Sequence, residues 1–525
     1  MTHRVEECDV LVVGGGPSGS TTAQLLAAWG RTVTIVHRPP PAHLTLAESL
    51  PASTRKLLRF LGQLEAVDAA GFYTNTGNRA DWARQSRATT SAEPGYHVSR
   101  GAFDRVLLEG ARTAGARVIE GTVQRVDVGD LARVTAVAAD GTSIDYRARY
   151  VADCSGRAGV IARHGLRRHL VSYRTLAIVA EWECDDWPTE EHTCTTIESF
   201  ADGWAWSVPL SATRRQCTVM VDPPSPARSR PGFGVTGPPS PARSRPGFGV
   251  TGPLSKEGSR PLFHVYEEAL AKATTLAARL AKARRVSAPW TCDASLYDAV
   301  RAGDRRVLLV GDAASFIEPL SSAGVKKALL SAWRAAVVLN TCLIDPAMAG
   351  PAIELHVRRE REVYDDCLRR SSAFFAEASA AYATPFWSAR AQHGAGAGSG
   401  AADPEDMSDD LLGRDDSIRA AFDRLRTDSI VHLRPAAQLQ FAPVPAIDGR
   451  VVVMREGLMV PGLTAPLQYA AGVDLARLAR IVSGCGDVPA IIEAYQHDVG
   501  PTPVAGLLTG LSLLVARHAL VAVDR

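Results

Sequence analysis

A glycine-rich turn near the start of the chain limits the possible folds more than any other feature. Residues 9–13 have the length and β-branched character of a buried strand, and residues 20–29 have the composition of a helix. Between them, Gly14, Gly16 and Gly19 form a G-x-G-x-x-G pattern. This order of strand, glycine turn and helix lets backbone N–H groups approach a pyrophosphate at the helix N-terminus. The turn therefore predicts a nucleotide-binding parallel α/β sheet.

The end of the second expected strand departs from this pattern. Residues 32–36 are followed by His37 and Arg38, where a dinucleotide-binding fold usually has an acidic residue that binds a ribose hydroxyl. Either the ribose contact is made differently or it is supplied from elsewhere, and Glu48 is available for it.

Three later segments carry a resemblance to a known family. Residues 307–314, which include Gly311 and Asp312, resemble the glycine-aspartate motif of class A flavoprotein monooxygenases, in which the aspartate holds the ribityl chain of FAD. Arg100 resembles an arginine of the same families that lies near the flavin. Residues 150–157 resemble the segment in those families where a strand passes into a glycine turn beside the adenosine. The resemblance implies a Rossmann-like FAD-binding domain of the p-hydroxybenzoate hydroxylase and glutathione reductase type, with an interleaved substrate sheet and a helical C-terminal region.

Further motifs narrow the resemblance to flavin-dependent halogenases. Residues 203–209 resemble their W-x-W-x-I-P signature, residues 316–324 their F-x-x-P-x-x-S-x-G stretch, and residues 48–51 their E-S-L-L-P segment. The cofactor-binding residues implied by these resemblances are Gly14, Gly16, Ser18, Gly19, Glu48, Ser49, Arg100, Gly311, Asp312, Ser322, Ala323, Gly324 and Val325.

One departure separates the chain from halogenases. In the family, reduced flavin and oxygen form a C4a-hydroperoxide, which a hydroxylase uses on an electron-rich ring and a halogenase uses to oxidise halide with the help of a lysine amine. Residues 71–82 resemble the stretch that carries this lysine, but Asn75 stands at its position. An amide has no ionisable amine. Lys56 is expected on a solvated helix face, and Lys326 and Lys327 are expected too close to the isoalloxazine to replace it.

The chain is therefore interpreted as a halogenase-like hydroxylase. Residues 77–82, 320–329 and 385–387 are similar to flavoproteins that mature peptide-derived quinone cofactors, the best-known of which hydroxylates a tryptophan on the way to cysteine tryptophylquinone. The resemblance implies a protein or peptide substrate bearing tryptophan. A halogenase, a small-molecule aromatic hydroxylase and a non-catalytic flavin-binding maturation partner remain as alternatives.

The candidate catalytic residues each have a second interpretation. Trp204 and Trp206 alternate along a strand and point to one face, where they either separate substrate from flavin or serve as core aromatics. Glu318 is a candidate acid or base, or a solvated loop carboxylate, and Asn75 occupies the lysine position. Ser322 is expected to begin a helix. The N–H groups at this helix N-terminus either stabilise negative charge on reduced flavin, or Ser322 is an ordinary N-cap.

Composition indicates a cytoplasmic enzyme. The 58 Lys and Arg residues nearly balance 56 Asp and Glu residues, so no basic field argues for nucleic acid. Nine cysteines without C-x-x-C spacing fit reduced thiols, and no signal peptide is expected. Residues 504–521 are expected to form a packed helix rather than a membrane span. A second G-x-G-x-x-G is lacking, so either NAD(P)H binds transiently or a flavin reductase supplies reduced flavin, with O2 as co-substrate.

The motifs predict five regions along the chain. They are a discontinuous FAD-binding domain (1–165 and 295–345), a substrate-side sheet (166–294) with a Pro/Gly insertion at 223–252, a helical extension (346–392), a flexible linker (393–410) and a helical C-terminal unit (411–525).

Overall fold

The computed structural model divides the chain into two compact units. The first contains residues 1–343 and 364–398, and the second contains residues 344–363 and 399–525. The predicted linker and nearly all of the predicted Pro/Gly insertion lie outside the described residues. The structure describes residues 4–41, 44–170, 172–223, 262–392, 415–427, 431–436, 439–463, 466–485 and 487–523.

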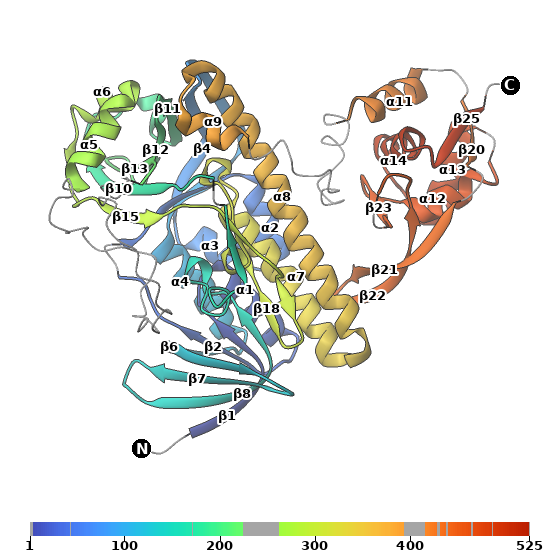
Figure 1. Ribbon diagram of the computed structural model, residues 1–525, viewed down its shortest axis with the longest axis horizontal. Coiled ribbons are helices and arrows are strands. Elements are labelled where there is room, and N and C mark those ends of the chain that lie inside the picture. The colour runs from blue at the N-terminus through green and yellow to red at the C-terminus, as the bar shows by residue number, and fades with distance from the viewer. Residues whose placement is uncertain are drawn as a thin grey trace, which may run out of the picture. The chain divides into compact units, whose positions relative to one another are not determined.

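A seven-stranded sheet carries the glycine turn of the first unit (Figure 1). Its strand order is β1-β2-β6-β7-β8-β18-β17, with β1 also paired to β8. The run β6-β2-β1-β8-β18 is parallel, as nucleotide-binding sheets require. Its strands are β1 (Arg4–Val13), β2 (Val33–His37), β6 (Arg117–Val128), β7 (Ala132–Ala138), β8 (Ser143–Asp153), β17 (Gly303–Asp304) and β18 (Val307–Leu309).

Helices pack beside this sheet, with the first of them directly against β1 and β2. They are α1 (Pro17–Ala28), α2 (Ser53–Phe60), α3 (Leu64–Ala69), α4 (Arg100–Thr113) and α7 (Gly324–Ile344). By length and hydropathy α7 could cross a membrane, but 83% of its most apolar window is buried inside the protein. This burial is typical of the central helix of a folded core.

A nine-stranded sheet stands beside the first one. Its order is β14-β10-β13-β12-β11-β4-β5-β3, with β15 paired to β10, and only the β11–β4 pair is parallel among its described strands. The strands are β3 (Ala47–Leu50), β4 (Tyr73–Trp82), β5 (Gln85–Ser99), β10 (Leu176–Glu183), β11 (Cys194–Phe200), β12 (Gly203–Pro209), β13 (Arg214–Val221), β14 (Arg284–Arg285) and β15 (Trp290–Asp293).

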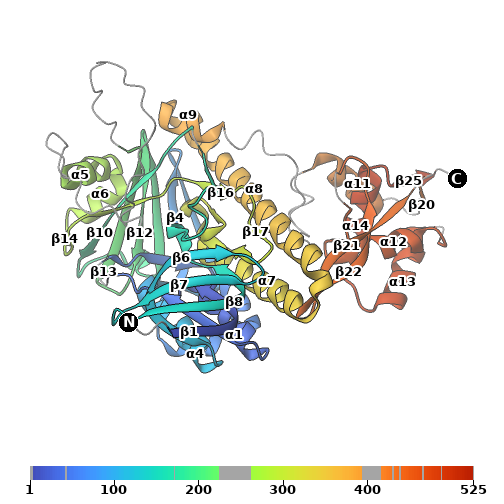
Figure 2. The same ribbon diagram turned by 60° about the horizontal axis from the view of Figure 1, so that its bottom comes forward.

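The two faces of the nine-stranded sheet are covered by different helices (Figure 2). Helices α5 (Leu262–Lys272) and α6 (Thr274–Leu280) pack on one face around the buried Tyr266. The end of α8 (Ala349–Tyr382) and α9 (Pro385–Ala391) pack on the other face. A small sheet of β9 (Arg167–His169), β16 (Tyr297–Ala299) and β19 (Ser315–Phe316) links the two large sheets.

The predicted α/β class with an interleaved second sheet is confirmed, but one predicted boundary is wrong. The sequence predicts residues 1–165 as part of the FAD-binding domain, yet β3, β4 and β5 within this range belong to the nine-stranded sheet. The cause is long-range pairing, because β4 aligns beside β11 from Gly77 and Cys194 onward.

The second unit is mixed rather than mostly helical, which corrects the prediction for residues 411–525. Residues 451–453 are three valines in succession, which favour a strand. They belong to a hairpin of nine residue pairs, which forms despite two prolines in the opposite strand. The unit contains α11 (Asp416–Thr427), α12 (Leu475–Val482), α13 (Val488–Val499), α14 (Val504–Ala516), β20 (His432–Pro435), β21 (Gln440–Asp448), β22 (Val451–Met459), β23 (Tyr469–Ala470), β24 (Val473–Asp474) and β25 (Leu520–Val523).

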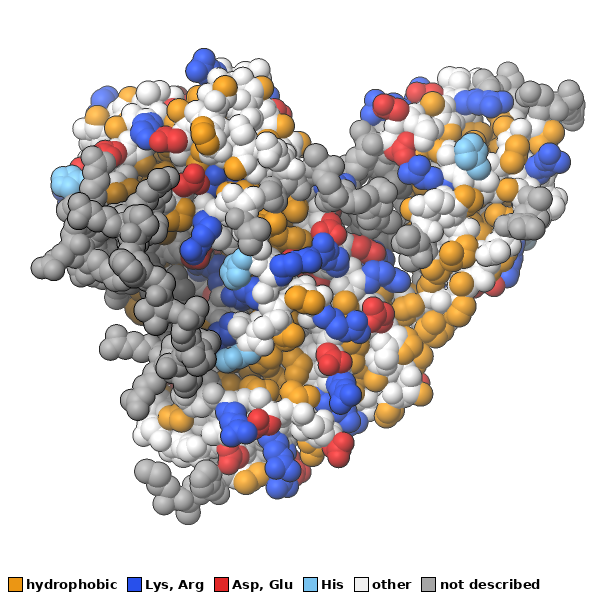
Figure 3. Space-filling view, viewed as in Figure 1, with side chains coloured by type: hydrophobic (Ala, Val, Ile, Leu, Met, Phe, Trp, Pro, Cys, Tyr) orange, Lys and Arg blue, Asp and Glu red, His pale blue; other side chains and the backbone are white. Residues whose placement is uncertain are grey.

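The core of the second unit is built around α14. Leu507, Leu511 and Leu514 are at most 1% exposed there, so the late apolar segment packs inside the unit as expected. Acidic and basic side chains are interspersed on the face shown in Figure 3, in keeping with the near balance of charge in the sequence.

Candidate flavin site and aromatic face

The glycine turn has the shape of a phosphate cradle. Gly14 has φ +106°, and a Cβ there would lie 2.5 Å from the carbonyl oxygen of Cys154. A Cβ on Gly19 would lie 1.9 Å from the carbonyl oxygen of Gly14, so α1 and β1 approach too closely for any side chain. At Gly16, in contrast, the nearest atom to such a Cβ is Asp104 Oδ2 at 3.7 Å. The backbone beside Gly16 is therefore open to a pyrophosphate.

A half-buried ionic cluster lies next to this opening. Arg100 Nε donates to Asp104 Oδ1 at 3.0 Å, and Arg100 Nη1 donates to Glu48 Oε1 at 3.3 Å. Burial lowers the pKa of Arg100, but Asp104 and Glu48 raise it by more, so the guanidinium stays charged. Burial likewise raises the pKa values of Glu48 and Asp104 against the attraction of Arg100. Asp104 follows Arg100 by four residues, which is about one helical turn. This spacing in the sequence could have predicted the ion pair between them.

The second flavin motif meets the first one at Ser18. Gly311 has φ +64°, and a Cβ there would lie 3.0 Å from Ser18 Oγ. The side chain of Asp312 follows, and its Oδ1 is buried without a hydrogen-bond partner among the described residues. Lys327 Nζ lies 3.8 Å from this oxygen and donates to the carbonyl oxygens of Gly311 and Ser315 at 3.0 and 2.5 Å. A free acceptor at Asp312 fits a ribityl hydroxyl.

His37 occupies the position expected for an acidic ribose ligand. It lies against the glycine turn, because a Cβ on Gly15 would be 3.0 Å from its ring. Its Nε2 is buried and has no hydrogen-bond partner in the described part of the chain. Burial lowers the pKa of His37, which favours the neutral ring. The alternative ligand, Glu48, is already bound to Arg100.

Asn75 joins two strands at the edge of the site. Its Nδ2 donates to Ser49 Oγ at 2.8 Å and to the Leu50 carbonyl at 3.2 Å, and its Oδ1 accepts from Gly77 N at 2.9 Å. The residue is 5% exposed. The amide nitrogen thus links β4 to β3, and the amide oxygen accepts from the backbone of β4 itself.

We expect Asn75→Ala to lower the free energy of unfolding by about 2 kcal/mol, because the buried partners of the amide lose their hydrogen bonds. Chemical denaturation of the purified proteins measures this change. Asn78→Ala on the same strand is the matched control, because Asn78 Oδ1 is buried but unpaired in the structure. A loss at position 78 as large as that at 75 would contradict the expectation.

The loop before α7 differs in detail from its expected form. Ser322 has φ +48° and lies outside the helix, so it is not the N-cap considered from sequence. The carbonyl of Ala323 accepts the first helical bond, from Lys327 N at 2.8 Å. Space is open beside Gly324, whereas Val325 is 3% exposed and faces the core. Only the first turn of α7 is then available to a flavin edge.

Trp204 and Trp206 lie on the same face of β12, as their spacing predicts. Their rings stack with centroids 4.8 Å apart. Trp82 packs edge-on against Trp204 at 6.2 Å and against Trp387 at 5.3 Å. Phe316, from the flavin loop, packs against the same cluster. We call these side chains the aromatic face. It brings together motifs from four separate segments.

Glu318 is buried, which corrects the alternative of a solvated loop carboxylate. It is 2% exposed, and its Oε1 has no hydrogen-bond partner among the described residues. Burial raises the pKa of Glu318 to about 7, against a lowering effect of Arg390. A carboxyl of this pKa exchanges a proton readily near neutral pH. Its catalytic role stays a prediction.

Comparison with known proteins places this geometry among flavoenzymes. Residues 7–232 match the FAD binding domain family. The tryptophan 2-halogenase of Chondromyces crocatus is 29% identical over 395 residues, which cover 73% of this chain and 70% of that protein. The 1H-pyrrole-2-carbonyl-[peptidyl-carrier protein] chlorinase of Pseudomonas fluorescens is 26% identical, covering 62% of this chain and 74% of that protein.

Two solved structures share the fold along most of the chain. CmlS, a flavin-dependent halogenase, has a TM-score of 0.75 and 22% identity, and the match covers 100% of this chain and 96% of CmlS. QhpG, a peptidyl tryptophan dihydroxylase essential for tryptophylquinone cofactor biogenesis, has a TM-score of 0.64 and 22% identity, covering 94% and 96%. These two structures show the fold, whereas the predicted flavin cofactor and oxidoreductase class are confirmed by the family match together with the sequence relatives.

Proposed function

We propose that this chain, an FAD-dependent oxidoreductase of the halogenase-like monooxygenase class, hydroxylates an aromatic ring and does not halogenate it. The observation that carries the proposal is Asn75, an amide with both ends hydrogen-bonded at the position where the resemblance to halogenases calls for a free lysine amine. An amide neither protonates an oxidant nor forms a chloramine.

Bound FAD in its reduced state supplies the activation of oxygen. The open backbone at Gly16 would take the pyrophosphate, Asp312 Oδ1 a ribityl hydroxyl, and His37 Nε2 a ribose hydroxyl. The charge of Arg100 would lie near the flavin, held by its two carboxylates. Glu318, with its pKa near neutrality, is the proposed proton acceptor or donor for the substrate ring.

Three of the described lysines are poor substitutes for the amine that halogenation needs. Lys327 lies beside Asp312, but its ammonium is held by two backbone carbonyls. Lys272 pairs with Asp202 at 2.5 Å on the surface, and Lys56 is exposed on α2. The halogenase names of the relatives favour the alternative of halogenation, which would need another residue to replace the lysine.

An indole carried by a peptide or protein is the proposed substrate. The sequence segments that resemble quinone-cofactor maturation enzymes include Trp82 and Trp387, and these two side chains pack together on the aromatic face. Trp82, Trp204 and Trp387 are at most 3% exposed, so the partly buried Trp206 and Phe316 are the members proposed to meet the substrate. An electron-rich ring stacks or packs edge-on against such neighbours. A tryptophan-bearing protein and a flavin reductase are the proposed partners.

The test supplies FADH2, oxygen and bromide to the purified protein together with tryptophan or a tryptophan-containing peptide. We expect a product mass that has gained oxygen and shows no bromine isotope pattern. A brominated product would overturn the proposal in favour of halogenation. Flavin binding without substrate-stimulated oxygen consumption would support the non-catalytic alternative. The apoprotein of Gly16→Val and a reaction without protein are the controls for oxidation by free reduced flavin.

A further inference from the structure

A cavity of about 460 Å³ lies on the nine-stranded sheet. Successive side chains of a strand point to opposite faces. Trp82 belongs to the aromatic cluster, whereas Arg79, Asp81, Thr196 and Glu198 line the cavity. Ala80 and Ile197, which lie between them on the two strands, contribute to both. Helix α6 closes the cavity through residues 275–279. The side chains of Arg79 and Thr196 therefore lie on the α6 face of the sheet, and Ala80 and Ile197 border the aromatic cluster.

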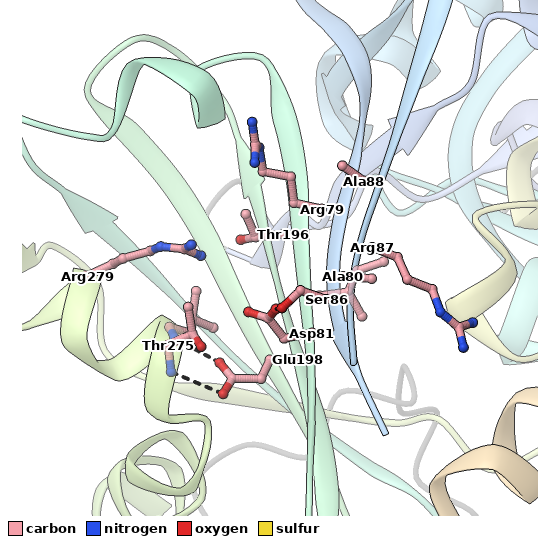
Figure 4. Close-up of a pocket in the computed structure, with 12 residues that line it drawn as sticks. Arg79, Ala80, Asp81, Ser86, Arg87, Ala88, Thr196, Glu198, Thr275 and Arg279 are labelled. Carbon is pink, nitrogen blue, oxygen red and sulfur yellow. Dashed lines mark hydrogen bonds between the residues drawn. The ribbon is translucent and has the colours of Figure 1, made fainter. Parts of the chain in front are cut away.

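The acidic side chains in this cavity already have partners, and Figure 4 shows hydrogen bonds to Glu198. Glu198 accepts from the backbone N–H groups of Thr275 and Leu276 at 3.1 and 2.8 Å. Asp81 accepts from Ser86 Oγ. Arg279 Nη2 lies 2.5 Å from Oε1 of Glu191, a residue that does not line the cavity. The acidic side chains of the lining are thus satisfied by donors of the protein.

Two donors on neighbouring strands have hydrogen-bonding capacity that the described residues do not use. Thr196 is 4% exposed, and its Oγ1 has no hydrogen-bond partner among the described residues. Its register partner on β4 is Arg79, so the two side chains lie side by side on adjacent strands. Arg79 Nε donates to the Glu190 carbonyl at 3.2 Å, and no described residue accepts from its two terminal nitrogens. Figure 4 shows both side chains at the cavity.

We propose that this cavity binds a small molecule through a carboxylate or phosphate group held by Arg79 and Thr196. If the Arg79 side chain turned toward Thr196, a guanidinium fork beside a hydroxyl donor would match the geometry of an oxyanion. The volume falls within the range of about 300–1,000 Å³ that is usual for small-molecule sites. The ligand would bind on the α6 face of the sheet, whereas Trp82 lies on the opposite face.

The test titrates FAD-loaded protein with inorganic phosphate and, separately, with benzoate in a calorimeter. Loading with FAD prevents either probe from occupying the glycine turn. We expect one of the probes to bind. We expect Thr196→Val and Arg79→Gln each to weaken that binding at least about tenfold, because each variant loses a hydrogen bond to the ligand. Binding of phosphate identifies a phosphate ester as the ligand class, and binding of benzoate identifies a carboxylate.

Thr195→Val is the matched control. Thr195 is 3% exposed, and its Oγ1 is also buried without a hydrogen-bond partner among the described residues, but it does not line the cavity. We expect this variant to bind the probe like the unchanged protein. All variants should retain their yellow colour, which shows that the flavin site is intact. The proposal is overturned if neither probe binds, or if a bound probe is insensitive to both Thr196→Val and Arg79→Gln.

Discussion

Gly16→Val should yield a folded protein without flavin. Gly16 has φ −80° and ψ −170°, a conformation that valine adopts without strain, and no atom outside its chain neighbours lies within 3.7 Å of the added Cβ. The side chain would instead fill the space proposed for the pyrophosphate. We expect FAD affinity to fall by about 100-fold or more, roughly 2.8 kcal/mol. Absorbance of the purified protein near 450 nm and a fluorescence titration with FAD measure the loss.

Circular dichroism separates this effect from misfolding. The unliganded Gly16→Val protein should unfold at the same temperature as unliganded wild type. Gly19→Ala provides the contrast, because its Cβ would meet the Gly14 carbonyl oxygen at 1.9 Å and should disrupt the fold itself. A Gly16→Val protein that stays fully yellow would show that the pyrophosphate binds elsewhere.

Glu318→Gln should remove a large part of the pH dependence of stability. The pKa of Glu318 in the folded protein is raised to about 7, above its ordinary value of 4.5. Between these values the folded state binds more protons than the unfolded state, so stability is lost as the pH rises through this window. From pH 5 to pH 8 the free energy of unfolding should fall by about 2–3 kcal/mol more in wild type than in Glu318→Gln.

Denaturant titrations at several pH values test this difference directly. Glu93→Gln, a change at an exposed carboxylate of β5, is the control and should follow the wild-type curve. Parallel curves for wild type and Glu318→Gln would show that the carboxyl is not held neutral by burial. A hydroxylation rate that keeps its pH profile in Glu318→Gln would separately remove Glu318 from the proposed proton transfer.

The flavin site could be predicted from sequence where its requirements are local. Gly14 and Gly19 leave no space for a side chain, and the strand and helix around them are continuous in the sequence. Asp312 follows a short buried strand in the same way. Ser18 and Gly311 meet in space although they lie far apart in the sequence, and only the resemblance to a family connected them.

Other parts of the site leave no local signal. The sequence places Lys327 close to the flavin loop but does not reveal that its ammonium binds two carbonyls of that loop. The burial of Glu318 depends on how the loop is covered, which its flanking residues do not reveal. The cavity on the nine-stranded sheet likewise forms only where α6 packs beside β4 and β11, which are distant from it in the sequence. The roles assigned to individual site residues stay predictions.

The parallel pairing of β4 with β11 has a consequence for how the protein is made. Gly77 leaves the ribosome well before Cys194, its register partner. At about 5–20 residues per second, β4 waits on the order of ten seconds with one edge unpaired. An open strand edge is a template for association with other chains. A truncated chain of residues 1–165 would make this state permanent, so this fragment should aggregate when it is expressed alone. The full-length nascent chain should depend on chaperones until β11 has been synthesised.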